Sequence, residues 1–179
     1  IAAGDLDHDG DADLVIGTRW LSDGYDHLLL GDGAGGFADL SPNRLEPSTL
    51  VTTHLVAGDF DGDGDVDLIG LGETERWWRN DGSGWFTDVA ASLLPHLTSP
   101  GQAVECLLSL DADGDGDLDL VVTRAAHDLL LINDGSGRFQ RAPAGALSDA
   151  SAPLTAIASG DLDGDGDVDL IYGVSLHSP

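Results

Sequence analysis

The chain has 179 residues, enough for one ordinary domain, and 41% of them are hydrophobic, which is enough for a core. Acidic residues outnumber lysine and arginine 33 to 7, which gives a formal net charge of −26. This charge argues against binding to nucleic-acid backbones or anionic membranes, because both need positive charge. No apolar run reaches the ~18 residues of a membrane span, and the single cysteine, Cys106, excludes an internal disulfide.

The sequence contains four copies of an aspartate-rich loop, and it predicts a strand before and after each copy. The stretch "GDLDHDGDADLVIG" starts at Gly4, and its first aspartate, Asp5, returns as Asp59, Asp111 and Asp161, at offsets of 54, 52 and 50 residues. A nearly fixed period of this length indicates a repeat architecture with one supersecondary unit per repeat. We place the approximate repeats at 1–51, 52–102, 103–153 and 154–179, the last incomplete, within a single repeat domain, 1–179.

Each repeat predicts four strands. A short apolar segment, such as 52–58 or 154–160, precedes the loop, and a second one rich in Val, Ile and Leu follows it directly. A third segment, at 27–33, 76–82 and 129–135, ends in a Gly-rich turn whose residues tolerate positive φ, and a fourth begins at a phenylalanine. Four antiparallel strands per repeat make the blade of a β-propeller, so the fold class is all-β with three full blades and half of a fourth.

The piece cannot easily close a ring, since closed propellers need ~4–8 blades. Either residues are missing or the open edges meet another copy. The chain opens at Ile1 and contains no methionine, so we expect a piece of a longer precursor.

The aspartate loop has the composition of a calcium site. Counted from its first aspartate, carboxylates stand at positions 1, 3, 5 and 9, a glycine stands at position 6, and the aspartate at position 7 can offer its backbone carbonyl. Six to eight hard oxygen ligands with a glycine at the bend suit Ca²⁺ better than Mg²⁺, and zinc is disfavoured because no Cys or His recurs in register. The loop is not an EF-hand, which needs a glutamate at position 12 and flanking helices. The predicted metal ligands are Asp5, Asp7, Asp9, Asp11 and Asp13; Asp59, Asp61, Asp63, Asp65 and Asp67; Asp111, Asp113, Asp115, Asp117 and Asp119; and Asp161, Asp163, Asp165, Asp167 and Asp169, with Asp11, Asp65, Asp117 and Asp167 acting through the backbone carbonyl.

We expect about four Ca²⁺ ions, one per loop, in a structural role. Without metal the five aspartates would repel one another and raise their pKa values. With metal, each loop would tie two strands together, and binding would add to folding free energy.

Together the loop, the strand after it, the "NDGSGxF" turn and the period resemble FG-GAP/VCBS-type repeats. These form the Ca²⁺-binding blades of the integrin α-subunit propeller, and "WWRNDGSGWFTDV" at 77–89 is similar to repeats of the ASPIC/UnbV group. The resemblance implies one Ca²⁺ in the hairpin between a blade's first two strands. It also implies a secreted or cell-surface module that recognises or adheres to a protein or glycan. The chain departs from the family in having fewer repeats than the usual seven or so.

Two other functions stay open. The repeats could be the scaffold of an extracellular carbohydrate-active enzyme whose catalytic residues lie elsewhere, or a structural unit that self-associates through open blade edges. Within this chain we expect no catalytic residues and no enzyme activity; a nucleophile pair of His54 and Cys106 lacks supporting context, and a free cysteine is usually a small buried hydrophobe.

Aromatic residues offer a candidate ligand surface. Trp77 and Trp78 are neighbours in a third strand, so their side chains point to opposite faces. One is expected to pack in the blade, and the other could join Arg76, Arg79 and Trp85 in a surface patch for a sugar or protein. Trp20, Tyr25 and His27 raise the same alternative in the loop 18–27.

Overall fold

The computed structural model describes residues 1–18, 26–45, 51–97, 103–124, 127–147 and 154–174. Their strands form three four-stranded antiparallel sheets and one two-stranded sheet, each with strands in chain order. The prediction of an all-β fold made of four-stranded blades, three full and one half, is confirmed. The first sheet comprises β1 (Ala2–Gly4), β2 (Asp13–Ile16), β3 (His27–Gly31) and β4 (Phe37–Asp39). The second comprises β5 (Thr52–Gly58), β6 (Asp67–Gly72), β7 (Glu75–Asn80) and β8 (Phe86–Asp88). The third comprises β9 (Val104–Leu110), β10 (Asp119–Arg124), β11 (Leu129–Asn133) and β12 (Phe139–Arg141), and the last comprises β13 (Leu154–Gly160) and β14 (Asp169–Val174).

We call these sheets blades 1 to 4. The second strand of each blade begins at position 9 of its loop, as the sequence predicted. Two helices of four residues, α1 (Ser41–Arg44) and α2 (Ala90–Leu93), follow blades 1 and 2; the sequence did not predict them. Asp39 Oδ1 accepts a hydrogen bond from Ser41 N, and Asp88 Oδ1 accepts one from Ala90 N, so an aspartate precedes and holds the start of each helix.

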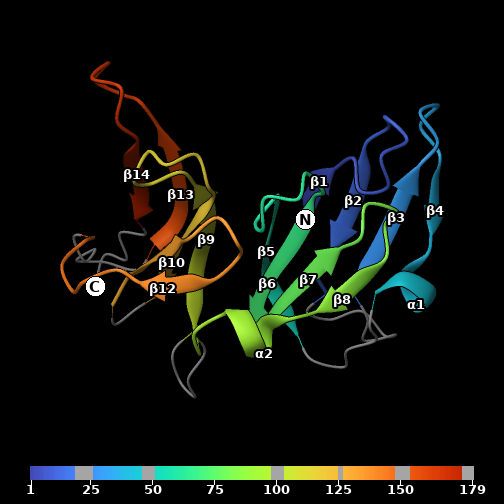
Figure 1. Ribbon diagram of the computed structural model, residues 1–179, viewed down its shortest axis with the longest axis horizontal. Helices are drawn as coiled ribbons and strands as arrows, with labels where there is room; N and C mark the ends of the chain where they lie inside the picture. Colours follow the sequence, from blue (N-terminus) through green and yellow to red (C-terminus); the bar gives the residue numbers. More distant parts are fainter. Residues whose placement is uncertain (19–25, 46–50, 98–102, 125–126, 148–153, 175–179) are drawn as a thin grey trace.

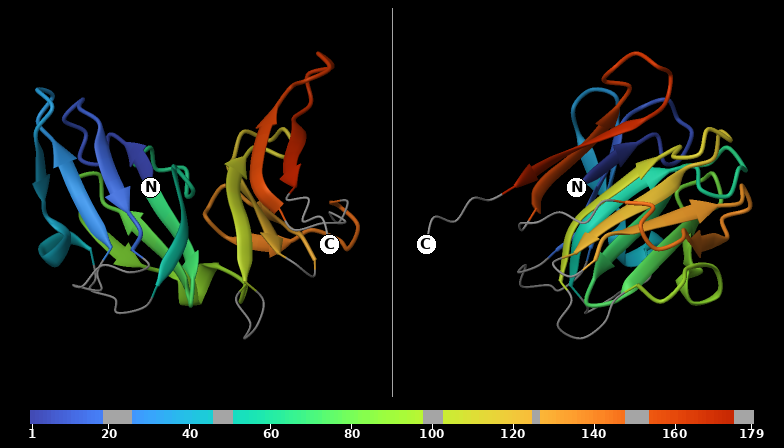
Figure 2. Two further views of the ribbon diagram at one scale, coloured as in Figure 1. Left: turned by 180° about the vertical axis from the view of Figure 1, so that it is seen from behind. Right: turned by 90° about the vertical axis from the view of Figure 1, so that its left-hand side faces the viewer.

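The blades form an open fan (Figure 1). The first strands of successive blades contact one another, β1 with β5, β5 with β9 and β9 with β13. The outer strands diverge, and blade 1 and blade 4 stand at opposite ends of the fan in Figure 1 and in the left view of Figure 2. This is the arrangement of part of a propeller around its axis.

Two hydrophobic cores lie between blades. One joins blades 1 and 2 and includes Leu6, Val15, Trp78 and Phe86. The other joins blades 2 and 3 and includes Phe60, Ile69, Trp77 and Phe139 among its ten buried residues. Each blade is therefore stabilised mainly by its neighbours, as expected for a repeat protein.

Candidate functional site

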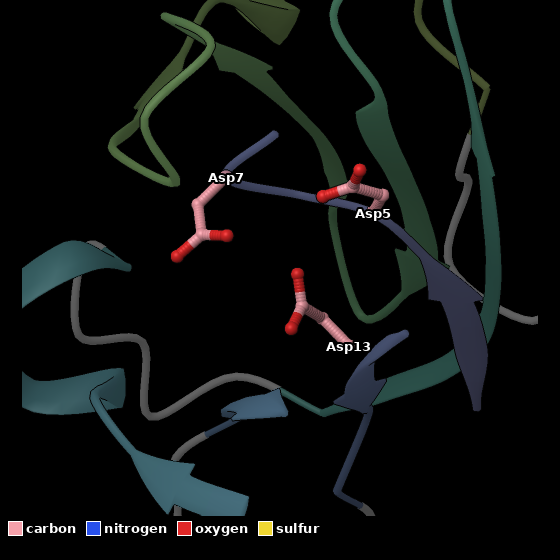
Figure 3. Close-up of side chains that lie close together, drawn as sticks. All are labelled: Asp5, Asp7 and Asp13. Carbon is pink, nitrogen blue, oxygen red and sulfur yellow. The ribbon is translucent and has the colours of Figure 1, made fainter. Parts of the chain in front are cut away.

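The four aspartate loops connect the first and second strands of the blades. In each loop three carboxylates bring one oxygen atom apiece within 4.8 Å of the others. The groups are Asp5, Asp7 and Asp13; Asp59, Asp61 and Asp63; Asp111, Asp113 and Asp115; and Asp161, Asp163 and Asp169. Figure 3 shows the carboxylates of the first group turned toward a common space. Positions 1 and 3 thus converge in every loop, joined by position 5 or position 9.

The carboxylate at position 1 also accepts a hydrogen bond from the backbone of its own loop. Its Oδ2 accepts the amide N–H of the glycine at position 6 in all four loops, over 3.1 Å in the pair Asp5–Gly10 and 2.9 Å in the pair Asp59–Gly64. These glycines have φ between 90° and 98°, a region that side chains with a Cβ avoid. The glycine therefore permits the bend that brings the aspartates together.

The aspartate at position 9 has a structural role that the sequence did not reveal. Asp13, Asp67 and Asp119 are fully buried. In each, Oδ1 accepts an N–H from the end of the blade's third strand, at Gly31, Asn80 and Asn133 respectively, over 2.8 Å. In Asp13 and Asp119 the second oxygen accepts the N–H of loop position 2. This carboxylate therefore joins the loop, the second strand and the third strand.

A cation fits the donor set of the loops. Four carboxylate oxygens there are buried without a hydrogen-bond partner: Asp5 Oδ1, Asp7 Oδ1, Asp61 Oδ1 and Asp67 Oδ2. Buried anionic oxygens are costly unless paired or bound to metal, and carboxylate oxygens are among the ligands that hard cations such as Ca²⁺ prefer. The assignment of individual ligands remains a prediction.

The electrostatics of the loop carboxylates agree with this fit. Burial raises the pKa of Asp67 to about 7. Burial, followed by repulsion from Asp63, raises the pKa of Asp61, and the same two effects, with Asp9 as the neighbour, raise the pKa of Asp7. A divalent cation would favour the ionised forms and reverse these shifts.

The aspartates at position 7 point their side chains at another part of the same blade. Asp11, Asp65 and Asp117 lie against the turn glycines Gly33, Gly82 and Gly135, between the third and fourth strands, where a Cβ would collide with the carboxylate. The three glycines also have positive φ. Position 7 therefore has a packing role in addition to the carbonyl ligand that we predict for it.

An asparagine in blade 2 and another in blade 3 each bind the aspartate loop of the preceding blade. Asn80 Nδ2 donates to Leu6 O, in the loop of blade 1, over 2.8 Å and to Val66 O, in the loop of its own blade, over 3.0 Å. Asn133 Nδ2 repeats this contact with Phe60 O and Leu118 O, over 2.8 and 3.2 Å. We call this pair of hydrogen bonds the asparagine clamp. Sequence reasoning missed it, although the recurrence of Asn before Asp-Gly in two of the three turns was a usable signal.

The aromatic patch is corrected by the structure. Trp77 and Trp78 are both buried, with 0% and 1% of their surface exposed. Trp77 belongs to the core between blades 2 and 3 and Trp78 to the core between blades 1 and 2. Both therefore pack, and neither contributes to a surface patch, because both faces of blade 2 are covered.

The remaining members of the patch lie in separate environments. Trp85 is exposed, and the Arg44 guanidinium carbon lies 5.7 Å from its ring centroid. Arg76 Nη1 pairs with Asp88 Oδ2 over 2.8 Å, whereas Arg79 Nη1 lies 3.7 Å from Asp61 Oδ2. Of the second aromatic set, Trp20 and Tyr25 lie outside the described residues, and His27 Nδ1 lies 2.9 Å from Asp39 Oδ2.

A pocket of about 570 Å³ lies beside α2. Its lining includes Glu75, Arg76, Asp88 and His96, together with the apolar side chains of Leu94 and Pro95. His96 Nδ1 lies 3.1 Å from Glu75 Oε1. Together with the ion pair of Arg76 and Asp88, this contact gives the pocket wall two pairs of polar side chains. The arrangement offers donors and acceptors to a polar ligand.

Cys106 is a free cysteine with a buried side chain, and this burial raises the pKa of its thiol. His54 Nε2 lies 2.9 Å from Glu105 O, and its Nδ1 lies 2.9 Å from Thr53 Oγ1. Both ring nitrogens therefore have partners other than the thiol. In the part of the chain that the structure describes, no helix has the length and apolar character needed to cross a membrane.

Comparison with known proteins supports the same architecture. The family model described as "FG-GAP-like repeat" matches residues 5–70 and 111–172. No curated protein matches the chain significantly. A solved structure titled as the basis of recognition of non-reducing terminal N-acetylglucosamine by an Agrocybe aegerita lectin superposes with a TM-score of 0.67 at 24% identity. The alignment covers 95% of this chain and 45% of the lectin chain, so this chain spans less than half the length of that structure.

Proposed function

The chain belongs to the FG-GAP-like repeat family, and from that premise we propose that it is a calcium-stabilised β-propeller module for recognition outside the cell. The observation that carries the proposal is the convergence of three carboxylates in each of four loops, at positions 1 and 3 in all of them and at position 5 or 9 for the third. The buried, unpartnered oxygens of loops 1 and 2 give it an energetic reason, since a cation would compensate their desolvation.

Calcium would act as a structural ion in this proposal. The residues at positions 1, 3, 5 and 9 would supply side-chain oxygens and position 7 a carbonyl, one ion per loop and about four per chain. Four Ca²⁺ ions would change the formal charge from −26 to about −18. Calcium sites of extracellular modules bind at ~10⁻⁴–10⁻³ M, which supports a secreted or cell-surface location.

The recognition role rests on the fold and on the pocket beside α2. The lectin with a similar fold recognises a sugar, and we propose a glycan or protein ligand for this chain. Arg76, Asp88, Glu75 and His96 in the pocket would provide hydrogen bonds to hydroxyl groups. The proposal assigns no catalytic step to the chain.

Calcium titration by calorimetry, with thermal melts in calcium and in chelator, tests the metal part. About four sites per chain and a large rise in melting temperature with calcium are expected. A melting temperature that is unchanged by chelator would refute the structural role of the ion.

Ligand recognition needs a separate test. Binding of glycans on an array and of free N-acetylglucosamine in solution should be compared between the wild type and the His96→Ala variant in calcium, because His96 lines the pocket with an exposed side chain. Binding that the variant loses, with its melting temperature retained, supports the pocket. Equal binding by both proteins would show that the ligand binds outside this pocket. An absence of glycan binding would leave protein ligands as the class to screen.

A further inference from the structure

Asp–Gly peptide bonds recur along the chain, in the aspartate loops and in the turns that join third and fourth strands. Such a bond is chemically labile because glycine has no side chain to obstruct its nitrogen. The nitrogen can attack Cγ of the preceding aspartate, which forms an N–Cγ bond while the N–H proton and the carboxyl hydroxyl leave as water. Water then opens the succinimide ring at the main-chain carbonyl and leaves isoaspartate, whose mass equals that of aspartate but whose backbone is one carbon longer.

In the aspartate loops, every glycine nitrogen of this kind donates a hydrogen bond to the position 1 carboxylate. In blade 2, Asp59 accepts the N–H of Gly62 over 2.8 Å and that of Gly64 over 2.9 Å. The position 1 aspartates of the other loops hold the equivalent glycines in the same way, at Gly10, Gly114, Gly116, Gly164 and Gly166. Hydrogen bonds to a charged acceptor are strong, and attack on Cγ must first break them. The structure therefore protects the Asp–Gly bonds of the loops.

The turns between third and fourth strands differ from one another at this atom. In blade 2, Gly82 N donates to Asn80 Oδ1 over 3.2 Å. Blade 1 has glycine in the place of Asn80 and offers no side-chain acceptor there. In blade 3, Oδ1 of Asn133 is buried without a hydrogen-bond partner, so it does not hold the turn. Among the hydrogen bonds of the described residues, none is donated by the nitrogen of Gly33 or Gly135.

The aspartates of the three turns are matched in other respects. Asp32, Asp81 and Asp134 are all exposed, and Oδ1 of each accepts the N–H two residues further along, over 2.9, 3.0 and 3.1 Å respectively. The glycine after each of them has positive φ. The hydrogen bond at the glycine nitrogen, present only in blade 2, is thus the difference between the turns.

We propose that Asp32 and Asp134 are sites of spontaneous covalent modification, at which the folded chain converts aspartate to isoaspartate, while Asp81 and the loop aspartates resist it. The reaction releases one water molecule and takes one up again, and it needs no cofactor or enzyme. The hydrogen bond in the blade 2 turn should slow attack about fivefold, since breaking it costs ~1 kcal/mol.

The modification would reach the aspartate loops. The carboxylates of Asp11 and Asp117, at position 7, lie against Gly33 and Gly135. The added carbon enters the backbone directly before these glycines, so it would displace the turn from the position 7 side chain. Isomerisation would thus loosen the contact of the turn with the loop of its own blade.

Prolonged incubation of the folded chain in calcium at neutral pH tests the proposal. Peptide mapping with electron-transfer fragmentation distinguishes isoaspartate from aspartate and assigns it to a residue. We expect isoaspartate to accumulate at Asp32 and Asp134 about fivefold faster than at Asp81. A parallel sample unfolded in guanidinium chloride should convert the three turns at similar rates, because the difference arises from the fold.

Two variants isolate the hydrogen bond. Asn80→Ala removes the Oδ1 that accepts from the turn, so Asp81 should convert about fivefold faster than in the wild type. Asn133→Ala breaks the equivalent clamp on the preceding blade but no hydrogen bond of its own turn glycine, so Asp134 should convert at an unchanged rate. Circular dichroism must show both variants folded.

Three results would overturn the proposal. The first is equal conversion at the three turns of the folded wild type. The second is a rate at Asp81 that Asn80→Ala leaves unchanged. The third is an absence of isoaspartate at Asp32 and Asp134 after the unfolded chain has converted.

Discussion

Asn80 in blade 2 donates its side-chain amide to the carbonyl of Leu6 over 2.8 Å, and Leu6 lies between two predicted calcium ligands, Asp5 and Asp7, of blade 1. The contact between blades is therefore made on the backbone of an aspartate loop. Gly84 of the blade 2 turn lies beside the same loop, so closely that a Cβ added to it would lie 3.3 Å from the Cβ of Asp7. Order in one loop thus depends on the position of the next blade.

Replacement of the clamp asparagines should weaken the contact between blades. Asn133→Ala removes the two hydrogen bonds of the clamp, and Asn80→Ala also removes those that its Oδ1 accepts from Gly82 N and Gly84 N. Both variants leave buried carbonyl groups unpaired, so each should lower the free energy of unfolding by ~1–3 kcal/mol. Chemical denaturation in calcium measures this loss. Asn43→Ala, at an exposed position of α1, is the control and should be near neutral; equal losses in all three variants would show that the clamp contributes nothing specific.

A change in one metal loop should have opposite effects with and without calcium. Asp61→Asn removes a carboxylate whose pKa is raised by burial and by Asp63, so in chelator the variant should melt at a higher temperature than the wild type. In calcium it should melt at a lower temperature and bind about one ion fewer. Calorimetric titration and paired thermal melts check both signs, and a variant that melts higher in both conditions would argue against a metal ligand at Asp61.

Loop 4 provides a more local comparison. Asp165→Ala should weaken calcium at loop 4 while the other three sites remain near normal, because the loops lie in separate blades. Calorimetry should then count about three sites at unchanged affinity. Simultaneous weakening of all sites would show that the loops bind cooperatively.

His8 is expected to be a strained residue. It has φ 59°, whereas the other loops have glycine at this position, at Gly62, Gly114 and Gly164. Its Nδ1 lies 3.3 Å from Asp65 Oδ1, a contact on the surface that contributes little. His8→Gly should therefore raise the free energy of unfolding by up to ~1 kcal/mol. Chemical denaturation of the two proteins tests this, and a loss of stability would mean that the contact outweighs the strain.

The two kinds of tryptophan in blade 2 should respond differently to truncation. Trp77→Ala removes a ring that packs edge-on against Phe139, with centroids 5.8 Å apart, and should cost ~3–5 kcal/mol. Trp85→Ala removes a half-exposed ring and should change the free energy of unfolding by less than ~1 kcal/mol. Urea denaturation of both variants measures the two losses in free energy of unfolding. Losses of similar size would contradict the assignment of Trp77 to the core.

Cys106 should react slowly in the folded protein. It is 7% exposed, and burial raises the pKa of its thiol, so the reactive thiolate is scarce at pH 8. A chromogenic disulfide reagent should label it at least tenfold more slowly in native than in denatured protein. Rapid labelling of the native chain would reopen the question of a reactive cysteine.

The sequence alone determined the repeat, the order of strands and the candidate metal loops. These are local features: alternating aspartates, a glycine at position 6 and short apolar runs each act within a few residues of one another, and the period multiplies the signal fourfold. The second strands begin at Asp13, Asp67, Asp119 and Asp169, as the loop numbering required.

Only the tertiary structure decided what lies between the blades. Alternation along a strand placed Trp77 and Trp78 on opposite faces, but it could not show that neighbouring blades cover both faces. The asparagine clamp joins residues more than 70 positions apart, and Asp67 is buried because a third strand closes over it. Such contacts depend on how whole sheets stack, and no local pattern of residues encodes that stacking directly.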